Sequence, residues 1–284
     1  MKDTILFGDC RETLSQIDEK VRMCVTSPPY YGLRNYGDEG KQIGLEDTPE
    51  EYINNLVNIF RSVRNCLSDD GTLWVNIGDS YYNYRPGKGQ ALVKQTVSAT
   101  KQDLPDKCAR RGNKLEGLKE KDLIGIPWML AFALRADGWY LRQDIIWNKP
   151  NPMPESVRDR CTKSHEYMFL LSKNQNYYFD VDVIKEPTRR KRSVWNINKK
   201  PYKGSHFAVF PPELITPCIL AGSEENDIVL DPFIGSGTTA MVARDLGRHY
   251  IGCELHEEYN DLIQQRVADD KVVHNGLTNA LNEL

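Results

Sequence analysis

Short apolar runs alternate along the chain with longer segments whose apolar residues recur at helical spacing. Runs rich in β-branched residues predict buried strands at 4–7, 21–26, 71–77, 140–147, 167–171, 227–230 and 250–253. Helical spacing, with capping residues or prolines at several starts, predicts helices at 48–67, 127–136, 211–221 and 238–246. Regular alternation of strand and helix predicts an α/β fold with a doubly wound, mostly parallel sheet.

Two polar, basic stretches interrupt this alternation at about 83–120 and 174–205. Nine basic residues stand against four acidic ones from residue 83 to residue 120, and eight against one from residue 185 to residue 203. Such runs are usually solvated loops, yet clustered Lys and Arg also dominate affinity for DNA phosphates. The formal net charge of −3 therefore does not exclude nucleic acid as a partner. With 284 residues, 40% of them hydrophobic, we expect one domain over 1–284 that carries both stretches as insertions.

A turn rich in hydrogen-bond acceptors follows the second predicted strand, in the sequence Thr26-Ser27-Pro28-Pro29-Tyr30. The prolines end the strand and donate no hydrogen bond, which leaves the Ser27 hydroxyl and the Ser27 and Pro28 carbonyls as acceptors. Two acceptors suit the two N–H groups of an exocyclic amine, as in cytosine or adenine, and holding them favours a more nucleophilic nitrogen. Tyr30 offers a flat face on which an extruded base can stack. The alternative is a tight turn that only ends a strand.

A glycine-rich loop follows the strand predicted at 227–230, in the sequence Asp231-Pro232-Phe233-Ile234-Gly235-Ser236-Gly237-Thr238-Thr239. Glycines let the backbone approach a ligand at the start of a helix, where free N–H groups face outward. The next strand ends at Glu254, 17 residues after Gly237, where an acidic side chain can accept hydrogen bonds from ribose hydroxyls. This pattern predicts a nucleotide cofactor.

The same loop fits the dinucleotide fingerprint G-x-G-x-x-G/A from Gly235 to Ala240, so an oxidoreductase is a competing interpretation. About thirty residues follow Glu254. These are too few to complete one half of a dinucleotide-binding fold if that half began at this loop. The rest of the sheet must then come from earlier in the chain. Neither the Asp-Pro-Phe lead-in nor the turn at 26–30 has a role in hydride transfer, which favours a different chemistry.

In this combination and order, the motifs resemble the amino-methyltransferases of DNA in their beta arrangement, whose catalytic motif precedes the cofactor motif. Residues 231–239 resemble the family's S-adenosylmethionine loop, and residues 26–30 resemble its catalytic motif in the cytosine-N4 branch. Residues 204–214 resemble the stretch that holds the methionine end of the cofactor. Gly8-Asp9-Cys10 resembles the turn that contacts its adenine. The resemblance implies a Rossmann-like methyltransferase sheet in permuted order.

The candidate site residues follow from these motifs. Catalysis is expected at Ser27, Pro28, Pro29 and Tyr30. Cofactor binding is expected at Asp9, Cys10, His206, Phe207, Phe210, Asp231, Phe233, Gly235, Ser236, Gly237, Thr238 and Glu254. DNA contacts are expected at Arg34, Arg158, Arg160, Lys163, Arg189, Arg190, Lys191 and Arg192, although 151–163 can equally be an ordinary loop. Tyr31 and Tyr36 are secondary candidates for closing over the base.

The resemblance implies direct transfer of a methyl group from S-adenosylmethionine to an amine of a base extruded from double-stranded DNA. Adenine enzymes of this type more often carry Asp at the first position of the catalytic motif. Because this chain carries Ser27, we expect N4-methylcytosine as the product, with adenine N6 as the alternative. A nicotinamide-dependent oxidoreductase and a DNA-binding regulator without turnover are more distant alternatives. The recognition sequence stays open.

The seven cysteines are dispersed and form no C-x-x-C pair, which predicts neither a disulfide framework nor a metal site. Pro217-Cys218 resembles the thiolate dipeptide of cytosine-C5 methyltransferases, but it falls in a predicted helix and is expected to be structural. The chain shows no N-terminal signal and no apolar run long enough to cross a bilayer, so a cytoplasmic protein is expected. A homodimer and a separately acting cognate restriction endonuclease are compatible with the resemblance.

Overall fold

The computed structural model describes residues 1–32, 42–82, 115–199 and 210–268. Its centre is a sheet with the strand order β1-β8-β7-β2-β3-β5-β4-β6. The strands are β1 (Thr4–Phe7), β2 (Val21–Thr26), β3 (Leu67–Ile77), β4 (Tyr140–Asn148), β5 (His165–Ser172), β6 (Val194–Asn196), β7 (Ile228–Asp231) and β8 (His249–Glu254). Among these described strands, only β5 runs antiparallel to its two neighbours, β3 and β4. The predicted α/β fold with a mostly parallel sheet is confirmed.

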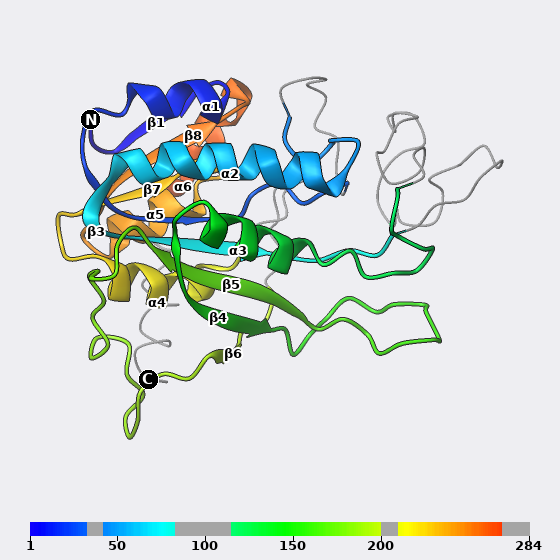
Figure 1. The fold of residues 1–284 in the computed structure, drawn as a ribbon. Coiled ribbons are helices and arrows are strands. Elements are labelled where there is room, and N and C mark those ends of the chain that lie inside the picture. The colour runs from blue at the N-terminus through cyan, green and yellow to red at the C-terminus, as the bar shows by residue number, and fades with distance from the viewer. Residues whose placement is uncertain (33–41, 83–114, 200–209, 269–284) are drawn as a thin grey trace.

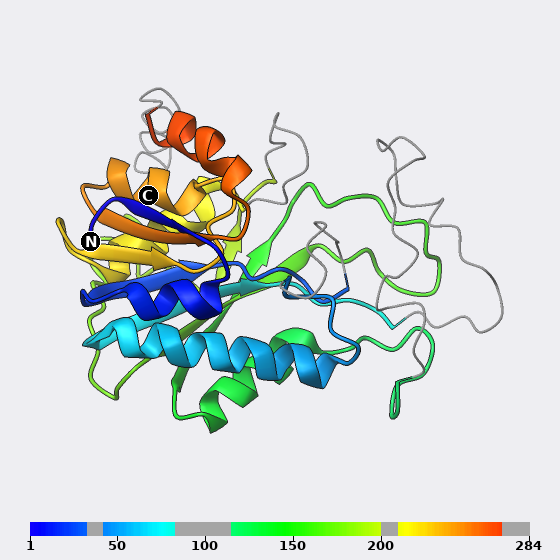
Figure 2. The ribbon, with the colours of Figure 1, turned by 90° about the horizontal axis from the view of Figure 1, so that it is seen from above.

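Helices cover both faces of this sheet, as expected for a doubly wound fold (Figures 1 and 2). One face carries α1 (Cys10–Thr13), α2 (Pro49–Cys66) and α3 (Ile126–Ala136). The other carries α4 (Pro212–Gly222), α5 (Thr238–Asp245) and α6 (Asn260–Ala268). Two hydrophobic clusters lie on the two faces, so the sheet is buried on both sides.

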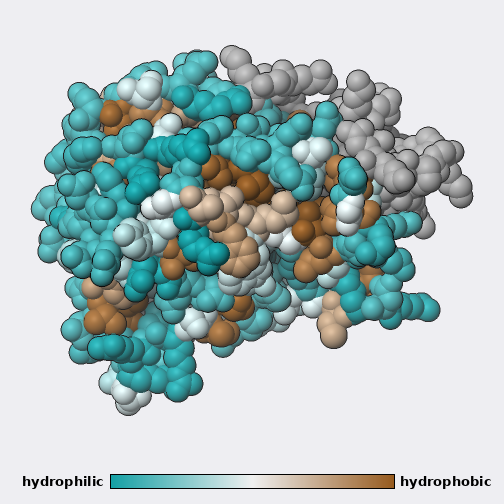
Figure 3. All heavy atoms as spheres, viewed as in Figure 1, coloured by the Kyte–Doolittle hydropathy of each residue, from teal (hydrophilic) through white to brown (hydrophobic). Residues whose placement is uncertain are grey.

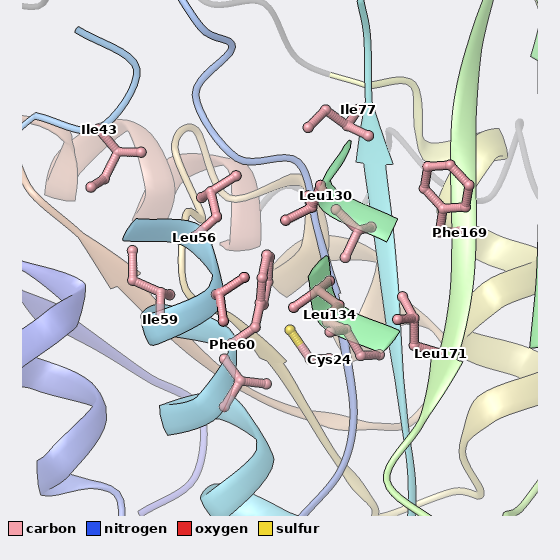
Figure 4. Close-up of a cluster of buried hydrophobic side chains, with 14 of the residues drawn as sticks. Cys24, Ile43, Leu56, Ile59, Phe60, Ile77, Leu130, Leu134, Phe169 and Leu171 are labelled. Atoms are coloured by element: carbon pink, nitrogen blue, oxygen red, sulfur yellow. The ribbon is translucent and has the colours of Figure 1, made fainter. Parts of the chain in front are cut away.

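Helix α2 supplies much of the first cluster. Thr48 caps its start, because the Thr48 hydroxyl accepts a hydrogen bond from the backbone N–H of Glu51 at 3.2 Å. The labelled side chains in Figure 4 come from α2, from α3, from strands β2, β3 and β5 and, for Ile43, from the turn before α2: Cys24, Ile43, Leu56, Ile59, Phe60, Ile77, Leu130, Leu134, Phe169 and Leu171. Apolar positions three and four residues apart on α2 thus meet α3 and the sheet, as their spacing predicts.

Two departures from the predicted elements have local causes. Strand β3 begins at Leu67, four residues before the predicted start, and its register with β2 shifts between Val21 and Met23. At this irregularity a Cβ atom on Gly71 would lie 2.9 Å from the Ser68 carbonyl oxygen, so the glycine allows the backbones to approach. Strand β6 was not predicted, because three residues inside a basic segment carry almost no periodic signal.

The face covered by α2 and α3 is mostly hydrophilic, with hydrophobic residues gathered near its middle, around α3 (Figure 3). Phe132 of α3 is one of the large hydrophobic residues exposed at the surface, with 47% of its surface exposed. No helix among the described residues combines the length and the apolar character needed to cross a membrane. The Pro217-Cys218 dipeptide lies inside α4 with its thiol fully buried, as expected of a structural pair.

The winding direction of the sheet reverses between β7 and β2. From β7 the chain passes through α5 to β8 on one side, whereas from β2 it passes through α2 to β3 on the other side. The two helices cover opposite faces, so a crevice is expected between the carboxyl ends of these two strands. The turn at 26–30, called the catalytic turn because catalysis is expected there, follows β2. The glycine-rich loop at 231–239 follows β7, so the topology brings both motifs to this one place.

Candidate active site

Asp231 joins the two motifs at the reversal point. Its Oδ1 atom accepts a hydrogen bond from the Thr26 hydroxyl at 2.6 Å, although the two residues are 205 positions apart in the sequence. The same oxygen accepts from the Phe233 N–H at 3.0 Å, and Oδ2 accepts from the Thr239 hydroxyl at 2.6 Å. Both oxygens therefore bind donors of the chain itself. Asp231, predicted as a cofactor contact, holds the end of β2 and the glycine-rich loop in one arrangement.

Burial sets the electrostatics of this junction. Asp231 is 1% exposed, and burial raises its pKa to about 6 against the opposing effect of its three donors. A carboxylate in this environment is costly without its hydrogen bonds, because a buried charge lacks the solvation that water would give. The carboxylate thus depends on its three donors, Thr26, Phe233 and Thr239, and in turn it orients them.

The glycine-rich loop provides space and an unsatisfied polar group. Gly235 has φ +51°, and among the described residues a Cβ atom there would meet only the Phe233 carbonyl oxygen, at 4.0 Å, so this part of the chain leaves space beside the Gly235 backbone. Gly237 has φ +83° and packs closely on Ile263, where a Cβ atom would lie 3.0 Å from Cγ2. Thr238 begins α5, and its buried hydroxyl has no hydrogen-bond partner among the described residues. A ligand with polar groups fits this cradle at the start of a helix.

Two acidic residues lie at the carboxyl ends of the next strands along the sheet. Glu254 ends β8 and is 8% exposed, and burial raises the pKa of its carboxyl group to about 7. The Gly8 N–H donates to the Glu254 carbonyl oxygen at 2.8 Å, which places the turn after β1 beside it. In that turn Asp9 accepts from the Arg11 N–H at 2.9 Å and forms an ion pair with the Arg11 guanidinium. The predicted ribose and adenine residues are therefore neighbours.

The catalytic turn is held from the α2 side. The Tyr52 hydroxyl of α2 donates to the Pro29 carbonyl oxygen at 2.8 Å. Gly44 packs against the turn so closely that a Cβ atom there would lie 2.9 Å from the Tyr30 carbonyl oxygen. The Pro29 carbonyl is thus occupied, whereas the acceptors expected to hold an amine belong to Ser27 and Pro28. These contacts make the turn a rigid platform at the crevice.

The chain is similar to known proteins over most of its length. The N6_N4_Mtase family model, described as DNA methylase, matches residues 21–265. The chain belongs to this DNA methylase family. It is 53% identical over 276 residues to the type II methyltransferase M.SmaI of Serratia marcescens, covering 93% of this chain and 90% of that protein.

Solved structures share the fold of this DNA methylase. PvuII DNA methyltransferase, described as cytosine-N4-specific, matches with a TM-score of 0.71 at 20% identity, covering 99% of this chain and 92% of that one. A Thermus thermophilus protein, described as a DNA modification methylase and solved in complex with S-adenosyl-L-methionine, matches with a TM-score of 0.64 at 25% identity, covering 93% and 92%. The predicted Rossmann-like methyltransferase fold is confirmed.

Several predicted cofactor residues of the DNA methylase have side chains that face the protein interior. The Cys10 thiol lies in the hydrophobic cluster, where burial raises its pKa, and the Ser236 hydroxyl is fully buried and accepts from Arg266 of α6. Phe233 and Phe210 are half-buried and pack against the two core clusters. Contacts from Cys10 and Ser236 to a ligand would therefore come from their backbone. His206 and Phe207 lie outside the described residues.

The predicted DNA-contacting residues of the methylase fall in two separate places. Arg158, Arg160 and Lys163 lie on the loop between β4 and β5, which extends beyond the carboxyl end of β4 (Figure 1). Arg160 stacks 3.9 Å from the centre of the Tyr81 ring, and Lys121 forms an ion pair with Asp159 at 2.7 Å. These contacts brace the loop on the side of the sheet where the catalytic turn lies.

The second basic group precedes β6 at the edge of the sheet. Since β6 runs parallel to β4, residues 189–192 lie toward the opposite end of the sheet from the catalytic turn. Arg189 forms an ion pair with Glu186, and Lys191 lies 5.3 Å over the Trp195 ring. Arg190 and Arg192 are exposed. Arg34 and Tyr36, the other predicted contacts near the base, lie outside the described residues.

A polar network beside the catalytic turn was not predicted from the sequence. Glu166 of β5 and Asn76 of β3 contact the Tyr30 hydroxyl, and Lys149 after β4 forms an ion pair with Glu166. None of the three belongs to a recognisable motif, and only the antiparallel pairing of β5 with β3 and β4 brings them together. Among the described residues, no group of three or more His, Cys, Asp or Glu side chains is arranged to hold a metal ion.

Proposed function

We propose that this DNA methylase transfers a methyl group from S-adenosylmethionine to the exocyclic N4 atom of a cytosine extruded from double-stranded DNA. The observation that carries the proposal is the Asp231 carboxylate, which ties the acceptor-rich turn at Ser27 to the glycine-rich loop. Family membership supports the methyl transfer to DNA, and the resemblance to M.SmaI supports a type II modification enzyme.

The cofactor fits the residues present at the crevice. Gly235 leaves room for it, the Thr238 hydroxyl is a buried group in need of a partner, and Glu254 and Asp9 stand where ribose and adenine are expected. S-adenosylmethionine, when bound, supplies an electrophilic methyl group. The chain's own contribution is positioning, because a methyl transfer between aligned partners needs little other assistance.

The turn at 26–30 acts on the amine. The Ser27 hydroxyl and the Ser27 and Pro28 carbonyls accept hydrogen bonds from the two amine hydrogens, which favours a pyramidal nitrogen with a localised lone pair. Tyr30 supplies an aromatic surface for the extruded base. The loop at 149–164 and its Arg158, Arg160 and Lys163 side chains contact phosphates near the extruded nucleotide.

The choice of cytosine N4 over adenine N6 depends on Ser27. Serine at the first position of the catalytic motif is the form found in the cytosine-N4 branch, and PvuII methyltransferase, which shares the fold, is described as cytosine-N4-specific. The acceptor geometry alone suits either amine. Adenine N6 therefore remains the alternative substrate atom within the same enzyme class.

Long-read sequencing of DNA from cells that express the protein tests the proposal, because it reports the modified base and its sequence context together. We expect modified cytosine at one recurring sequence with the wild-type chain and strongly reduced modification with Ser27→Ala. Ser15→Ala, which removes an exposed hydroxyl outside the site, is the matched control and should modify DNA like the wild type. Unmodified DNA in cells with folded wild-type protein would reject the proposed activity.

A further inference from the structure

The hydroxyl of Tyr30 is held by a polar network behind the catalytic turn. It donates to Glu166 Oε2 at 2.7 Å and lies 3.4 Å from Asn76 Oδ1. Asn76 in turn donates through Nδ2 to the Tyr167 carbonyl oxygen at 3.1 Å, which fixes its amide. The second carboxylate oxygen of Glu166 forms an ion pair with Lys149. Each member of the network therefore has a defined partner.

The ring of Tyr30 is confined as well. A Cβ atom on Gly78 would lie 2.7 Å from Tyr30 Cε2 and 3.3 Å from Glu166 Cγ, so only glycine leaves space for both side chains at the end of β3. Tyr30 packs against the first hydrophobic cluster and is half-buried as a whole residue. With the hydroxyl bound at one end and Gly78 beneath, the ring has one orientation.

The charges of the network suit a fixed, uncharged tyrosine. Glu166 and Lys149 are only 17% and 13% exposed, so the pair is shielded from water and the hydrogen bond from Tyr30 to the carboxylate is charge-assisted. Burial and the neighbouring Glu166 raise the pKa of Tyr30, which keeps the hydroxyl protonated as a donor. A hydrogen bond with Ser27 opposes this rise in pKa, which links the network to the first residue of the catalytic motif.

We propose that Glu166, neutralised by Lys149, is a positioning residue that acts through Tyr30 to orient the extruded base. The inference rests on the proposed function, since it assigns Tyr30 to the base. Glu166 fixes the hydroxyl, Gly78 fixes the ring, and the ring then presents a stationary surface to a planar nucleobase. The base is held with its amine at Ser27 because the ring cannot turn away.

The test is a set of variants in the full-length protein: Tyr30→Phe, Glu166→Ala, Glu166→Gln and the double variant of the first two. Each is assayed for single-turnover methyl transfer to DNA that carries the mapped recognition sequence. Tyr30→Phe and Glu166→Ala should each slow transfer roughly ten- to a hundredfold, the usual scale for a reactant displaced by about an ångström. The double variant should be no slower than the slower single variant, because both changes break one contact.

Glu166→Gln keeps an oxygen that accepts from Tyr30 and should recover most of the lost rate. A fluorescent base analogue at the target position gives a second readout, since stacking on an aromatic ring quenches it. Complexes of Tyr30→Phe and Glu166→Ala should be brighter than the wild-type complex, with the calorimetric affinity for S-adenosylmethionine unchanged. Glu224→Gln and Tyr177→Phe change one exposed carboxylate and one surface hydroxyl outside the site and serve as controls.

If Tyr30→Phe transferred the methyl group at the wild-type rate and its DNA complex had the wild-type fluorescence, the inference would be overturned, even if Glu166→Ala failed to fold. Additive effects of the two changes in the double variant would also overturn it. A wild-type protein that transfers no methyl group to DNA would instead reject the proposed function. The two failures are thus separate, because the first is measured against an active wild type.

Discussion

Asp231 illustrates how much one buried carboxylate can organise. Its three donors come from the end of β2, the glycine-rich loop and the first turn of α5. Asp231→Ala would leave two buried hydroxyls and one N–H without their acceptor, at a cost of about 1 to 3 kcal/mol for a buried group left unpaired. We expect the free energy of unfolding, measured by urea denaturation, to fall by roughly 2 to 4 kcal/mol.

Asp18→Ala is the matched control, because Asp18 is an exposed aspartate outside the site. It should change the free energy of unfolding by less than about 0.5 kcal/mol. A similarly small effect of Asp231→Ala would mean that the junction between the two motifs does not depend on this carboxylate.

We expect Glu254 to make cofactor binding depend on pH. Burial raises its pKa from 4.5 to about 7, so without a ligand the folded protein loses stability as pH rises through that range. Ribose hydroxyls that donate to the ionised carboxylate favour its charged form, so affinity should rise as pH rises through about 7. Calorimetry should give a Kd about tenfold larger at pH 6 than at pH 8, because the ionised fraction of the Glu254 carboxyl group is about tenfold smaller at pH 6.

Glu254→Gln cannot ionise, so its affinity should show much less pH dependence. At pH 8 it should bind the cofactor roughly 1 to 3 kcal/mol more weakly than the wild type, the cost of losing hydrogen bonds to a charged group. The same pH dependence in wild type and variant would show that another group titrates and that Glu254 does not hold the ribose.

At the scale of elements, the loop at 149–164 and the segment at 185–199 divide the predicted DNA contacts. The loop extends from the sheet end that carries the catalytic turn, whereas Arg190 lies toward the opposite end. We expect Arg158→Glu to weaken binding to cognate and scrambled duplexes alike and to reduce the salt slope by about 1. Fluorescence anisotropy at several salt concentrations measures both effects.

Arg190→Glu makes the same charge change at another exposed arginine, and its effect on DNA binding should be smaller. A larger effect of Arg190→Glu would place the DNA across the β6 edge of the sheet. Loss of affinity for the cognate duplex alone in Arg158→Glu would mean that this arginine reads bases and not phosphates.

The helices and strands that could be predicted are those whose own residues carry the full pattern of apolar positions and end signals. Strands β1 and β2 begin and end where their apolar runs predict, and the cap at Thr48 predicts the start of α2. The network at Tyr30 could not be predicted, because Glu166 and Lys149 reach it through strand pairing that no local spacing encodes. The separation of the two basic groups depends on strand pairing in the same way.

At the scale of the whole molecule, the order of the strands explains how a permuted chain builds one site. Strand β2 carries the catalytic turn early in the chain, β7 carries the glycine-rich loop late in the chain, and the two are neighbours at the reversal of the sheet. The motif order could be recognised from the sequence, and family membership confirms what it implied. The methylated atom could not be derived in this way, since both candidate amines offer the same two hydrogens.

Mass spectrometry of nucleosides from DNA methylated by the purified protein with S-adenosylmethionine tests the central claim most directly. We predict N4-methylcytosine as the dominant modified nucleoside and a strong reduction with Ser27→Ala, whose affinity for the cofactor should be unchanged. N6-methyladenine as the dominant product would contradict the assignment of the target base.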